Sequence, residues 1–486
     1  MILIIILKLF CKVRLLTMLT YSLHTSSKIP LYEQLYQAIK IDILEGKLKS
    51  NEKLPSKRNF SKHLGISVVT IETSYQQLQA EGLIYSLPKK GFFVAQIQVQ
   101  RVKSEKRIRL VSNLKTRSEN PKTKFNLGSN QINPETFPFA TWSKLLRSVL
   151  NDNQEQLVEP SPSQGVLELR QAIASHLNAY RGMAIDPQQI VIGAGTDYLY
   201  LLLIQLLGPE KTVAIENPGY PKIKKIYEQF KVSYQFLPVQ KDGIDLASLN
   251  KSTADIVHIS PSHQFPTGVI LPISKRYELL AWASQKKNRF IIEDDFDSEF
   301  RFGGKPLPSL QEIDHSDRVI YINTFSKSLV STLRISYMIL PPQLLPLFQE
   351  RLDLYSNTVS NLEQYTLAKF IKDGYFEKHL NRMRLYYQRK RDDVLKNFKE
   401  SPLSEHISII NSSSGLHFII EIKTTIPEHT FCKRALEQDL SLIPVSYFYH
   451  EENTLWSNCF IVNYSNIKSV DITNIISILE NILQEY

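Results

Sequence analysis

Hydrophobic residues follow different spacings in three successive regions of the chain. Up to about residue 95, apolar residues recur at the spacing of amphipathic helices and then in two short runs typical of strands. From 96 to 124 the apolar residues are scattered and aperiodic among Lys, Arg, Ser, Asn and Gln. From about 125 to the end, short apolar runs alternate with helical patterns. The spacing therefore predicts an N-terminal helical module, a flexible linker at 96–124 and an α/β body.

The N-terminal region predicts three helices followed by a β-hairpin. Gly65 stops the second helix, and Ser67 is a good N-cap for the third. The expected helices lie at 31–44, 56–64 and 67–80, and the expected strands at 83–87 and 92–94. This order is typical of a winged helix-turn-helix, which we assign to residues 29–95.

The region from 125 to 486 alternates helical patterns with short apolar runs. The runs expected to be strands are 189–192, 212–215, 256–260, 290–293 and 318–322. Such alternation predicts a mostly parallel sheet covered by helices, with ligands at the carboxyl ends of its strands. Longer helical runs and the apolar segments 416–422 and 459–463 predict a smaller C-terminal subdomain.

Charge is distributed unevenly along the chain. Residues 1–125 hold 22 Lys and Arg against 8 Asp and Glu, whereas the remainder holds 36 against 40. The net charge of +10 therefore belongs to the N-terminal quarter. A basic module on a nearly neutral body suggests a polyanion such as double-stranded DNA as its partner, although a solvated basic surface is the alternative.

The first residues and the cysteines indicate the compartment. Residues 1–28 form an extension whose opening apolar run is too short to span a membrane, and its charges follow that run instead of preceding it as in a signal peptide. We favour translation from Met18, with residues 1–17 as an upstream extension. The three cysteines, Cys11, Cys432 and Cys459, show neither metal-site nor disulfide spacing. We therefore expect a cytoplasmic protein with no membrane or metal partner.

Hydroxyl, amide and basic side chains gather where the predicted module would meet DNA. Short polar side chains at a helix N-terminus approach phosphates and base edges, and lysines at a wing tip contact the backbone or the minor groove. The candidate DNA contacts are Ser56, Lys57, Arg58, Ser67, Thr70, Ser74, Lys89 and Lys90. Each residue alone also fits a solvated surface or a helix cap, whereas their combined order is more specific.

A lysine follows the last of the predicted strands in the sheet. Lys327 lies in the sequence Thr324-Phe325-Ser326-Lys327-Ser328-Leu329, and Arg334 comes seven residues later. An amine with a lowered pKa condenses with an aldehyde to give a Schiff base, and hydroxyls with an arginine suit a phosphate. An aldehyde and a phosphate on one small molecule suggest pyridoxal 5′-phosphate (PLP). The alternative for this segment alone is a surface lysine in a Ser-rich loop.

Other predicted strand ends supply side chains that suit the same cofactor. Asp294 closes one strand and could pair with the pyridine nitrogen of PLP. Gly195 and Thr196 open a helix whose amides suit a phosphate. Tyr220 lies in a Pro-Gly turn where it could stack on a ring, and 262–268 is a further strand-end loop. Each feature alone also fits an ordinary turn, so the inference depends on their combination.

The N-terminal motifs resemble the GntR-type winged helix. The matching segments are Pro30–Leu35, Leu54–Arg58, Leu64–Ser67, Thr70, Tyr75, Leu78, Gly82 and Gly91–Val94. Residues 125–486 resemble fold type I aminotransferases in the order of their strand-end motifs. The combination resembles the MocR family of bacterial transcriptional regulators. The expected fold is thus α/β, with a winged helix-turn-helix joined to an aminotransferase-like domain.

The resemblance implies roles for individual residues. Lys327 would form the Schiff base, Asp294 would pair with the pyridine nitrogen, and Tyr220 would lie near the ring. The residues implied around the phosphate are Gly195, Thr196, Thr324, Ser326 and Arg334. The chain departs from the family pattern in three places: Val68 replaces a common basic residue, Asp197 a frequent amide, and Phe296 a frequent Tyr. Phe265 takes the place of the aminotransferase Asn, where aromatic residues are usual in this family. The resemblance also implies a homodimer.

Capture of a substrate carboxylate is the weak point of an enzymatic interpretation. Transaminases hold that group with an arginine of the C-terminal domain, yet 456–464 contains none, which leaves Lys468 and Arg434 as candidates. We favour a regulator that senses PLP itself, as a PdxR-like regulator of vitamin B6 synthesis would, or an amine or amino acid. The alternatives are an active aminotransferase with an accessory DNA-binding domain, and a dimerisation scaffold that does not bind PLP.

Overall fold

The computed structural model describes residues 19–97, 123–128, 136–302, 307–450 and 455–484. The chain divides into two compact units, Met1–Asn120 and Pro121–Tyr486. The predicted extension at 1–17 and nearly all of the predicted linker lie outside the described residues. No helix in the described part of the chain combines the length and apolarity needed to cross a membrane.

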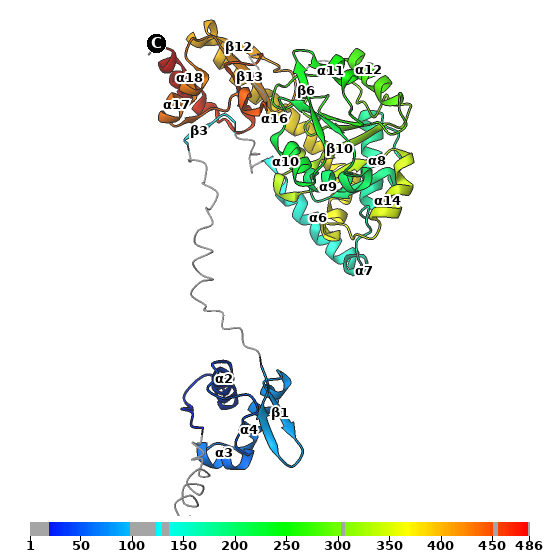
Figure 1. Ribbon diagram of the computed structural model, residues 1–486. Coiled ribbons are helices and arrows are strands. Elements are labelled where there is room, and N and C mark those ends of the chain that lie inside the picture. Colours follow the sequence, from blue (N-terminus) through cyan, green and yellow to red (C-terminus); the bar gives the residue numbers. More distant parts are fainter. Residues whose placement is uncertain (1–18, 98–122, 129–135, 303–306, 451–454, 485–486) are drawn as a thin grey trace, which may run out of the picture. The chain divides into compact units, whose positions relative to one another are not determined.

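The N-terminal unit is a three-helix module with a two-stranded wing (Figure 1). Its elements are α2 (Leu31–Leu44), α3 (Lys57–Leu64), α4 (Val68–Ala80), β1 (Ile84–Leu87) and β2 (Gly91–Val94). The wing strands pair antiparallel, with Ile84 opposite Val94. One core joins all five elements, and Leu19, Tyr21 and Leu23 pack against it from the preceding segment. The winged helix-turn-helix prediction is confirmed. Residues 19–23 also pack against its core, although they precede the predicted start of the domain at residue 29.

The second unit is built on an eight-stranded mixed sheet. In spatial order its strands are β4 (Ile190–Gly193), β11 (Ser336–Ile339), β10 (Val319–Thr324), β9 (Phe290–Asp294), β8 (Ile256–Ile259), β5 (Val213–Asn217), β6 (Tyr234–Gln240) and β7 (Gly243–Ile244). The five from β10 to β6 are parallel, whereas β11 is antiparallel to both of its neighbours. The mostly parallel sheet is confirmed, and its predicted strands agree with the structure to within about two residues at each end.

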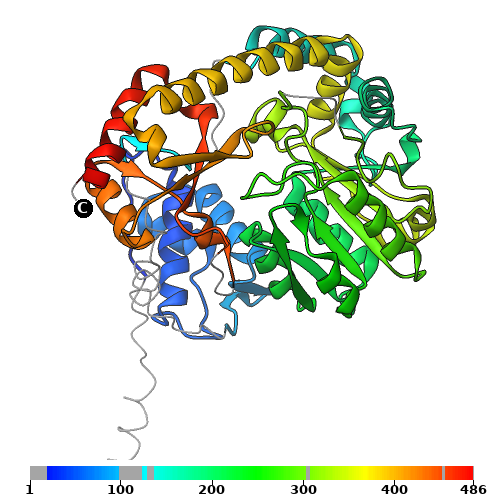
Figure 2. The same cartoon turned by 90° about the horizontal axis from the view of Figure 1, so that it is seen from above.

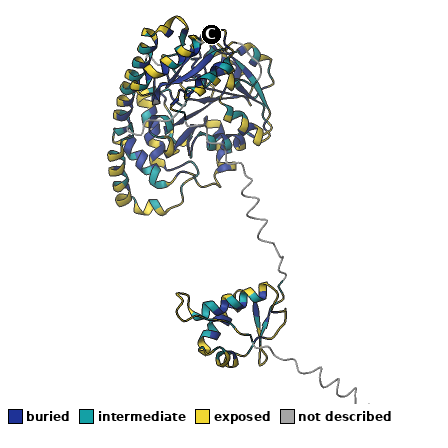
Figure 3. Ribbon diagram, turned by 90° about the vertical axis from the view of Figure 1, so that its left-hand side faces the viewer, coloured by how far each residue is buried: buried dark blue, intermediate teal, exposed yellow. Residues whose placement is uncertain are grey.

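Helices cover both faces of this sheet because its strands are apolar on both sides. In β10, Ile320 and Ile322 face one helical layer, while Val319 and Tyr321 face the other. The first layer contains α9 (Thr196–Leu207), α10 (Pro221–Gln229) and α14 (Leu345–Leu352). The second contains α8 (Leu167–Arg181), α11 (Leu246–Lys251), α12 (Ile273–Ser284) and α15 (Asn361–Lys372). Figure 3 shows the strands as mostly buried and the outer helix faces as exposed.

A smaller subdomain follows the sheet, as predicted. Its three-stranded sheet has the order β12 (Ile407–Ile410), β13 (His417–Ile422) and β15 (Cys459–Asn463). The helices α17 (Glu428–Glu437) and α18 (Ser469–Gln484) belong to its core. The long helix α16 (Tyr375–Glu400), gold in Figure 2, links this subdomain to the helices beside the large sheet.

Three further helices and two short strands also belong to the second unit. The helices are α6 (Phe139–Asp152), α7 (Gln154–Val158) and α13 (Phe325–Ser328). The strands β3 (Phe125–Asn126) and β14 (Leu440–Ser441) pair in parallel. The start of the second unit is therefore hydrogen-bonded to the C-terminal subdomain.

Candidate functional site

Two serines cap helices of the N-terminal module, and the sequence predicts one of these caps, Ser67. The Ser56 hydroxyl accepts the Asn59 amide at 3.3 Å and begins α3. The Ser67 hydroxyl accepts the Thr70 amide at 3.0 Å and begins α4. Each cap satisfies a backbone donor that the helix itself leaves unpaired.

The basic candidates of this module differ in their surroundings. Arg58, Lys89 and Lys90 are exposed. Lys57 instead forms an ion pair with Glu72 on α4, which leaves it partly engaged within the unit. Three exposed cations on α3 and at the turn of the wing give this unit a surface suited to phosphates.

Ser74 corrects the sequence prediction. It has no exposed surface, and its hydroxyl donates to the carbonyls of Tyr32 and Thr70 at 2.7 and 2.9 Å. The packing of α2 against α4 covers this position, so Ser74 stabilises the module and cannot reach DNA. Val69, by contrast, is 69% exposed on the first turn of α4.

A cavity of about 360 Å³ lies at the carboxyl ends of the parallel strands. This volume falls within the range of small-molecule sites. Seven of the predicted cofactor residues line it: Thr196, Tyr220, Asp294, Thr324, Ser326, Lys327 and Arg334. The eighth, Gly195, contacts Arg334 at its edge. The structure thus gathers residues separated by more than a hundred positions in the sequence.

One end of the cavity is built from the start of α9 and from Arg334. A Cβ atom at residue 195 would lie 2.2 Å from the Arg334 guanidinium, and the φ angle of Gly195 is +93°. Only glycine meets both conditions without strain. Arg334 pairs with Asp197 at 3.3 Å, and Asp197 also pairs with Lys222. Two cations and the amides of a helix N-terminus therefore surround this end, with one carboxylate among them.

Lys327 lies on α13, directly after β10. The Thr324 hydroxyl caps this short helix by accepting the Ser326 amide at 3.1 Å, and the Ser336 hydroxyl donates to it at 2.8 Å. Burial lowers the pKa of Lys327 to about 8, while the carboxylate of Asp297 opposes the shift. A minority of the amine is therefore already neutral near physiological pH, and this is the form that attacks an aldehyde.

Asp294 is buried at the end of β9. Burial raises its pKa to about 7, and the hydrogen bond from Tyr200 lowers it in part. The Tyr200 hydroxyl donates a hydrogen bond to Oδ2 of Asp294, whereas Oδ1 has no hydrogen-bond partner among the described residues. An unpaired buried oxygen at a cavity wall is suited to a ligand that donates a hydrogen bond.

Aromatic side chains border the same cavity. Tyr220 is 46% exposed and meets Phe265 edge to face, with ring centroids 6.0 Å apart. Phe265 and Phe296 both line the cavity. Their apolar rings provide surface for packing a flat ligand.

The cavity wall also contains residues that the sequence did not predict, among them Tyr200, His258 and Glu216. Tyr200 lies one helical turn after Thr196, and His258 interrupts the apolar run of β8. A histidine inside a fully buried strand could have been noticed in the sequence. Burial raises the pKa of Glu216 to about 8, so this group is largely protonated at neutral pH.

The two candidates for holding a substrate carboxylate do not line the cavity. The cationic side chains that line its described part are Lys222, Lys224, Lys327 and Arg334, with His450 from the C-terminal subdomain. Neither Arg434, on α17, nor Lys468 is among the lining residues.

Comparison with known proteins matches both units. Residues 31–94 match the family of bacterial regulatory proteins of the gntR type, and residues 122–479 match aminotransferase class I and II. The HTH-type regulator YdeL of Bacillus subtilis is 38% identical over 89% of this chain and 92% of its own length. The probable rhizopine catabolism regulatory protein MocR of Rhizobium meliloti is 30% identical over 88% of this chain and 89% of its own. The chain belongs to the MocR family of transcriptional regulators.

Two further similarities bear on this MocR-family chain. The pyridoxine biosynthesis regulator PdxR of Corynebacterium glutamicum is 29% identical over 82% of this chain and 84% of its own length. The kynurenine aminotransferase of Pyrococcus horikoshii superposes with a TM-score of 0.65 at 22% identity, over 78% of this chain and 94% of that protein. The second unit therefore has the fold type I aminotransferase fold, as the sequence predicted.

Proposed function

We propose that this MocR-family regulator binds PLP in the cavity at Lys327 and couples the state of that ligand to DNA binding. The observation that carries the proposal is the convergence of Lys327, Asp294 and the Gly195–Arg334 contact on one cavity. These three features match the aldehyde, the pyridine nitrogen and the phosphate of one cofactor.

The unpaired Oδ1 of Asp294 supports the fit of PLP. A protonated pyridine nitrogen would donate to this oxygen and would compensate for the burial of the carboxylate. At the other end, the α9 amides, Thr196 and Arg334 would hold the phosphate, with Thr324 and Ser326 beside them. When bound, PLP supplies an aldehyde that reacts with amines and a ring that withdraws electrons.

Asp197 would compete with a bound phosphate for Arg334. It pairs with both Arg334 and Lys222, so a phosphate near Arg334 would compete with this carboxylate. Lys222 would then retain Asp197 while Arg334 turns to the phosphate. This exchange leaves every charge partnered.

We further propose that the exposed face of α3, α4 and the wing contacts DNA. Arg58, Lys89 and Lys90 would meet phosphates, with Lys57 as a weaker contributor because of its ion pair with Glu72. Ser56, Ser67 and Thr70 would approach the backbone at the two helix N-termini. A homodimer, which the family resemblance implies, would favour paired half-sites in the operator.

The ligand sensed is PLP itself or an amine that reacts with it. The relative named for pyridoxine biosynthesis supports PLP, and the scarcity of arginine in the cavity argues against tight capture of a substrate carboxylate. An active aminotransferase is the alternative function, and rapid amino-group transfer to a keto acid would favour it.

A spectral titration tests the cofactor proposal. PLP added to the purified chain should give an absorption band near the boundary of the visible and ultraviolet, and Lys327→Ala should abolish it because the amine is lost. Lys224→Ala is the matched control, since Lys224 lines the same cavity and should leave the band intact. A wild-type chain that stays colourless with excess PLP would contradict the proposal.

A further inference from the structure

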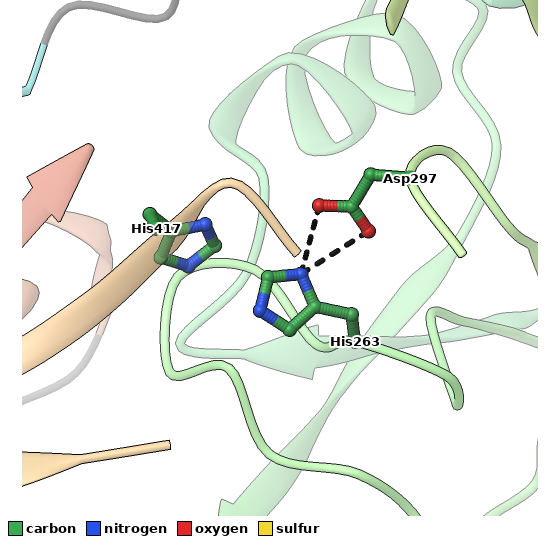
Figure 4. A group of neighbouring side chains, drawn as sticks. All are labelled: His263, Asp297 and His417. Carbon is green, nitrogen blue, oxygen red and sulfur yellow. Dashed lines mark hydrogen bonds and ion pairs between the residues drawn. The ribbon is translucent and has the colours of Figure 1, made fainter. Parts of the chain in front are cut away.

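A second group of titratable side chains lies beside the cavity and has no part in the proposed cofactor contacts. His263, Asp297 and His417 are each at most 4% exposed, and their donor and acceptor atoms lie within 4.8 Å of one another (Figure 4). His263 comes from the loop after β8, Asp297 from the loop after β9, and His417 from β13. The group therefore joins the large sheet to the C-terminal subdomain.

The hydrogen bonds of this group fix where its protons lie. Nδ1 of His263 lies 2.9 and 3.1 Å from the two carboxylate oxygens of Asp297, which only accept, so this nitrogen carries a proton. Nε2 of His417 lies 3.0 Å from the Pro266 carbonyl and is likewise the donor. Burial lowers the pKa of His417 to about 3, so its other nitrogen, Nδ1, is an acceptor.

The second ring nitrogen of His263, Nε2, differs from Nδ1 in its surroundings. It is buried without a hydrogen-bond partner among the described residues, on the side of the ring that faces His417 in Figure 4. The two histidine rings lie 4.5 Å apart between centroids.

Close packing holds the His263 ring in place. A Cβ atom at residue 415 would lie 1.9 Å from Cε1 of this ring, and one at residue 268 would lie 3.3 Å from Nε2. Both positions are glycines with positive φ angles. The backbone that leads into β13 therefore rests directly on His263.

Topology brings Asp297 to the cofactor lysine. The strands β9 and β10 are parallel neighbours, with Asp294 opposite Ile322. Asp297 lies three residues after β9, and Lys327 lies three residues after β10, so both loops leave the same edge of the sheet. The carboxylate of Asp297 is the charge that favours the protonated form of the Lys327 amine.

We propose that Asp297, held by His263, is the buried counter-charge of the Lys327 amine, and that both are positioning residues for the cofactor lysine. The other titratable groups that interact with Asp297 are His417, Asp294 and Tyr464. Asp294 is paired with Tyr200, and the Tyr464 hydroxyl donates to the Gly415 carbonyl. Asp297 is therefore the carboxylate placed to balance the lysine.

The electrostatics favour a proton over a metal ion within this group. The three side chains are a reasonable donor set for a divalent cation. The Lys327 ammonium, which Asp297 favours, would repel such an ion, whereas a hydrogen bond from Nδ1 of His263 leaves Asp297 its negative charge to balance that ammonium.

The inference rests on Lys327 as the cofactor lysine, and its test works without cofactor. The full chain is dialysed against hydroxylamine, which strips carbonyl compounds from amines. Trace acetylation with acetic anhydride is then followed at Lys327 by peptide mass spectrometry from pH 6 to pH 10. The pH at which acetylation of Lys327 is half-maximal is the midpoint of labelling. Asp297→Asn should lower this midpoint by about one pH unit, because a buried ammonium loses its counter-charge.

Three variants separate this role from a purely structural one. His263→Phe should lower the midpoint as well, since an unsupported buried carboxylate takes up a proton, whereas His263→Gln keeps an N–H donor and should retain the midpoint. Asp245→Asn is the matched control, because this N-cap of α11 lies outside the group and asparagine caps equally well.

Unchanged midpoints in folded Asp297→Asn and His263→Phe chains would overturn the inference. If Asp297→Asn does not fold, the contrast between the two His263 variants decides. A chain that takes up no PLP yet shows the shifted midpoint would contradict the proposed function alone. A chain that binds PLP with unshifted midpoints would contradict this inference alone.

Discussion

At the scale of single residues, Arg58 is the cation best placed to contact a phosphate. It is exposed at the first turn of α3, directly after the Ser56 cap. A helix N-terminus and a guanidinium both attract a phosphate, so the two effects add at this position. Such a contact does not depend on the base sequence.

Arg58→Ala should weaken binding to a random-sequence duplex and reduce the slope of log K against log salt by about one. Binding is measured by fluorescence anisotropy over a series of salt concentrations, which requires no knowledge of the operator. The matched change is Lys47→Ala, where the lysine is exposed but paired with Asp42 and Glu45 at the end of α2. If both variants reduced the slope of log K against log salt equally, the net charge of the unit would explain the effect, and a specific contact of Arg58 would not.

Local motifs predicted the cofactor residues better than they predicted exposure. Lys327, Asp294 and Tyr220 each follow a strand that the apolar pattern marks, and the structure brings all three to the cavity. Ser74 was assigned to DNA because its position on α4 was judged without knowing how α2 crosses that helix. Its hydroxyl donates to Tyr32, a contact over 42 residues that no local pattern contains.

At the scale of elements, the start of α4 depends on Ser67. This cap satisfies the Thr70 amide and leaves Val68 and Val69 exposed on the first turn. The helix enters its first turn without an acidic residue, so the cap is its main N-terminal stabiliser.

Ser67→Ala should lower the free energy of unfolding of the N-terminal unit by about 1 kcal/mol. Hydrogen exchange of peptides from residues 19–97 over a denaturant series measures this change, because it follows this unit separately from the second. Ser86→Ala, on the exposed side of β1, serves as the comparison and should be nearly neutral. Equal stability of the Ser67 variant and the wild type would show that tertiary packing alone fixes the start of α4.

The sequence predicts which segments form strands, but it does not predict the order of those strands in the sheet. The apolar runs located β4, β5, β8, β9 and β10, because strands buried on both faces consist mainly of apolar residues. Nothing in those runs shows that β11 inserts between β4 and β10 in the opposite direction. The approach of His263, Asp297 and His417 likewise depends on three elements far apart in the sequence.

At the scale of the whole molecule, the two units have separate hydrophobic cores. A ligand that binds only the folded second unit stabilises that unit by mass action. The N-terminal core shares no residue with the cavity, so it gains nothing directly from the ligand.

Calorimetry of the full chain should therefore show PLP raising one unfolding transition and leaving the other in place. At one hundred times the dissociation constant the stabilisation is about 2.7 kcal/mol. The Lys327→Ala chain should show a much smaller shift. A single transition that moves as a whole would mean that the two units unfold cooperatively.

The pairing of β3 with β14 has a consequence for how a bound ligand could be reported. The first described residues of the second unit, Phe125 and Asn126, are hydrogen-bonded to Leu440 and Ser441, and Leu127 continues this contact to Asn463 on β15. The chain that leads back to the DNA-binding unit is thus anchored on the C-terminal subdomain and not on the large sheet. Any displacement of that subdomain would therefore also displace the point at which the second unit begins.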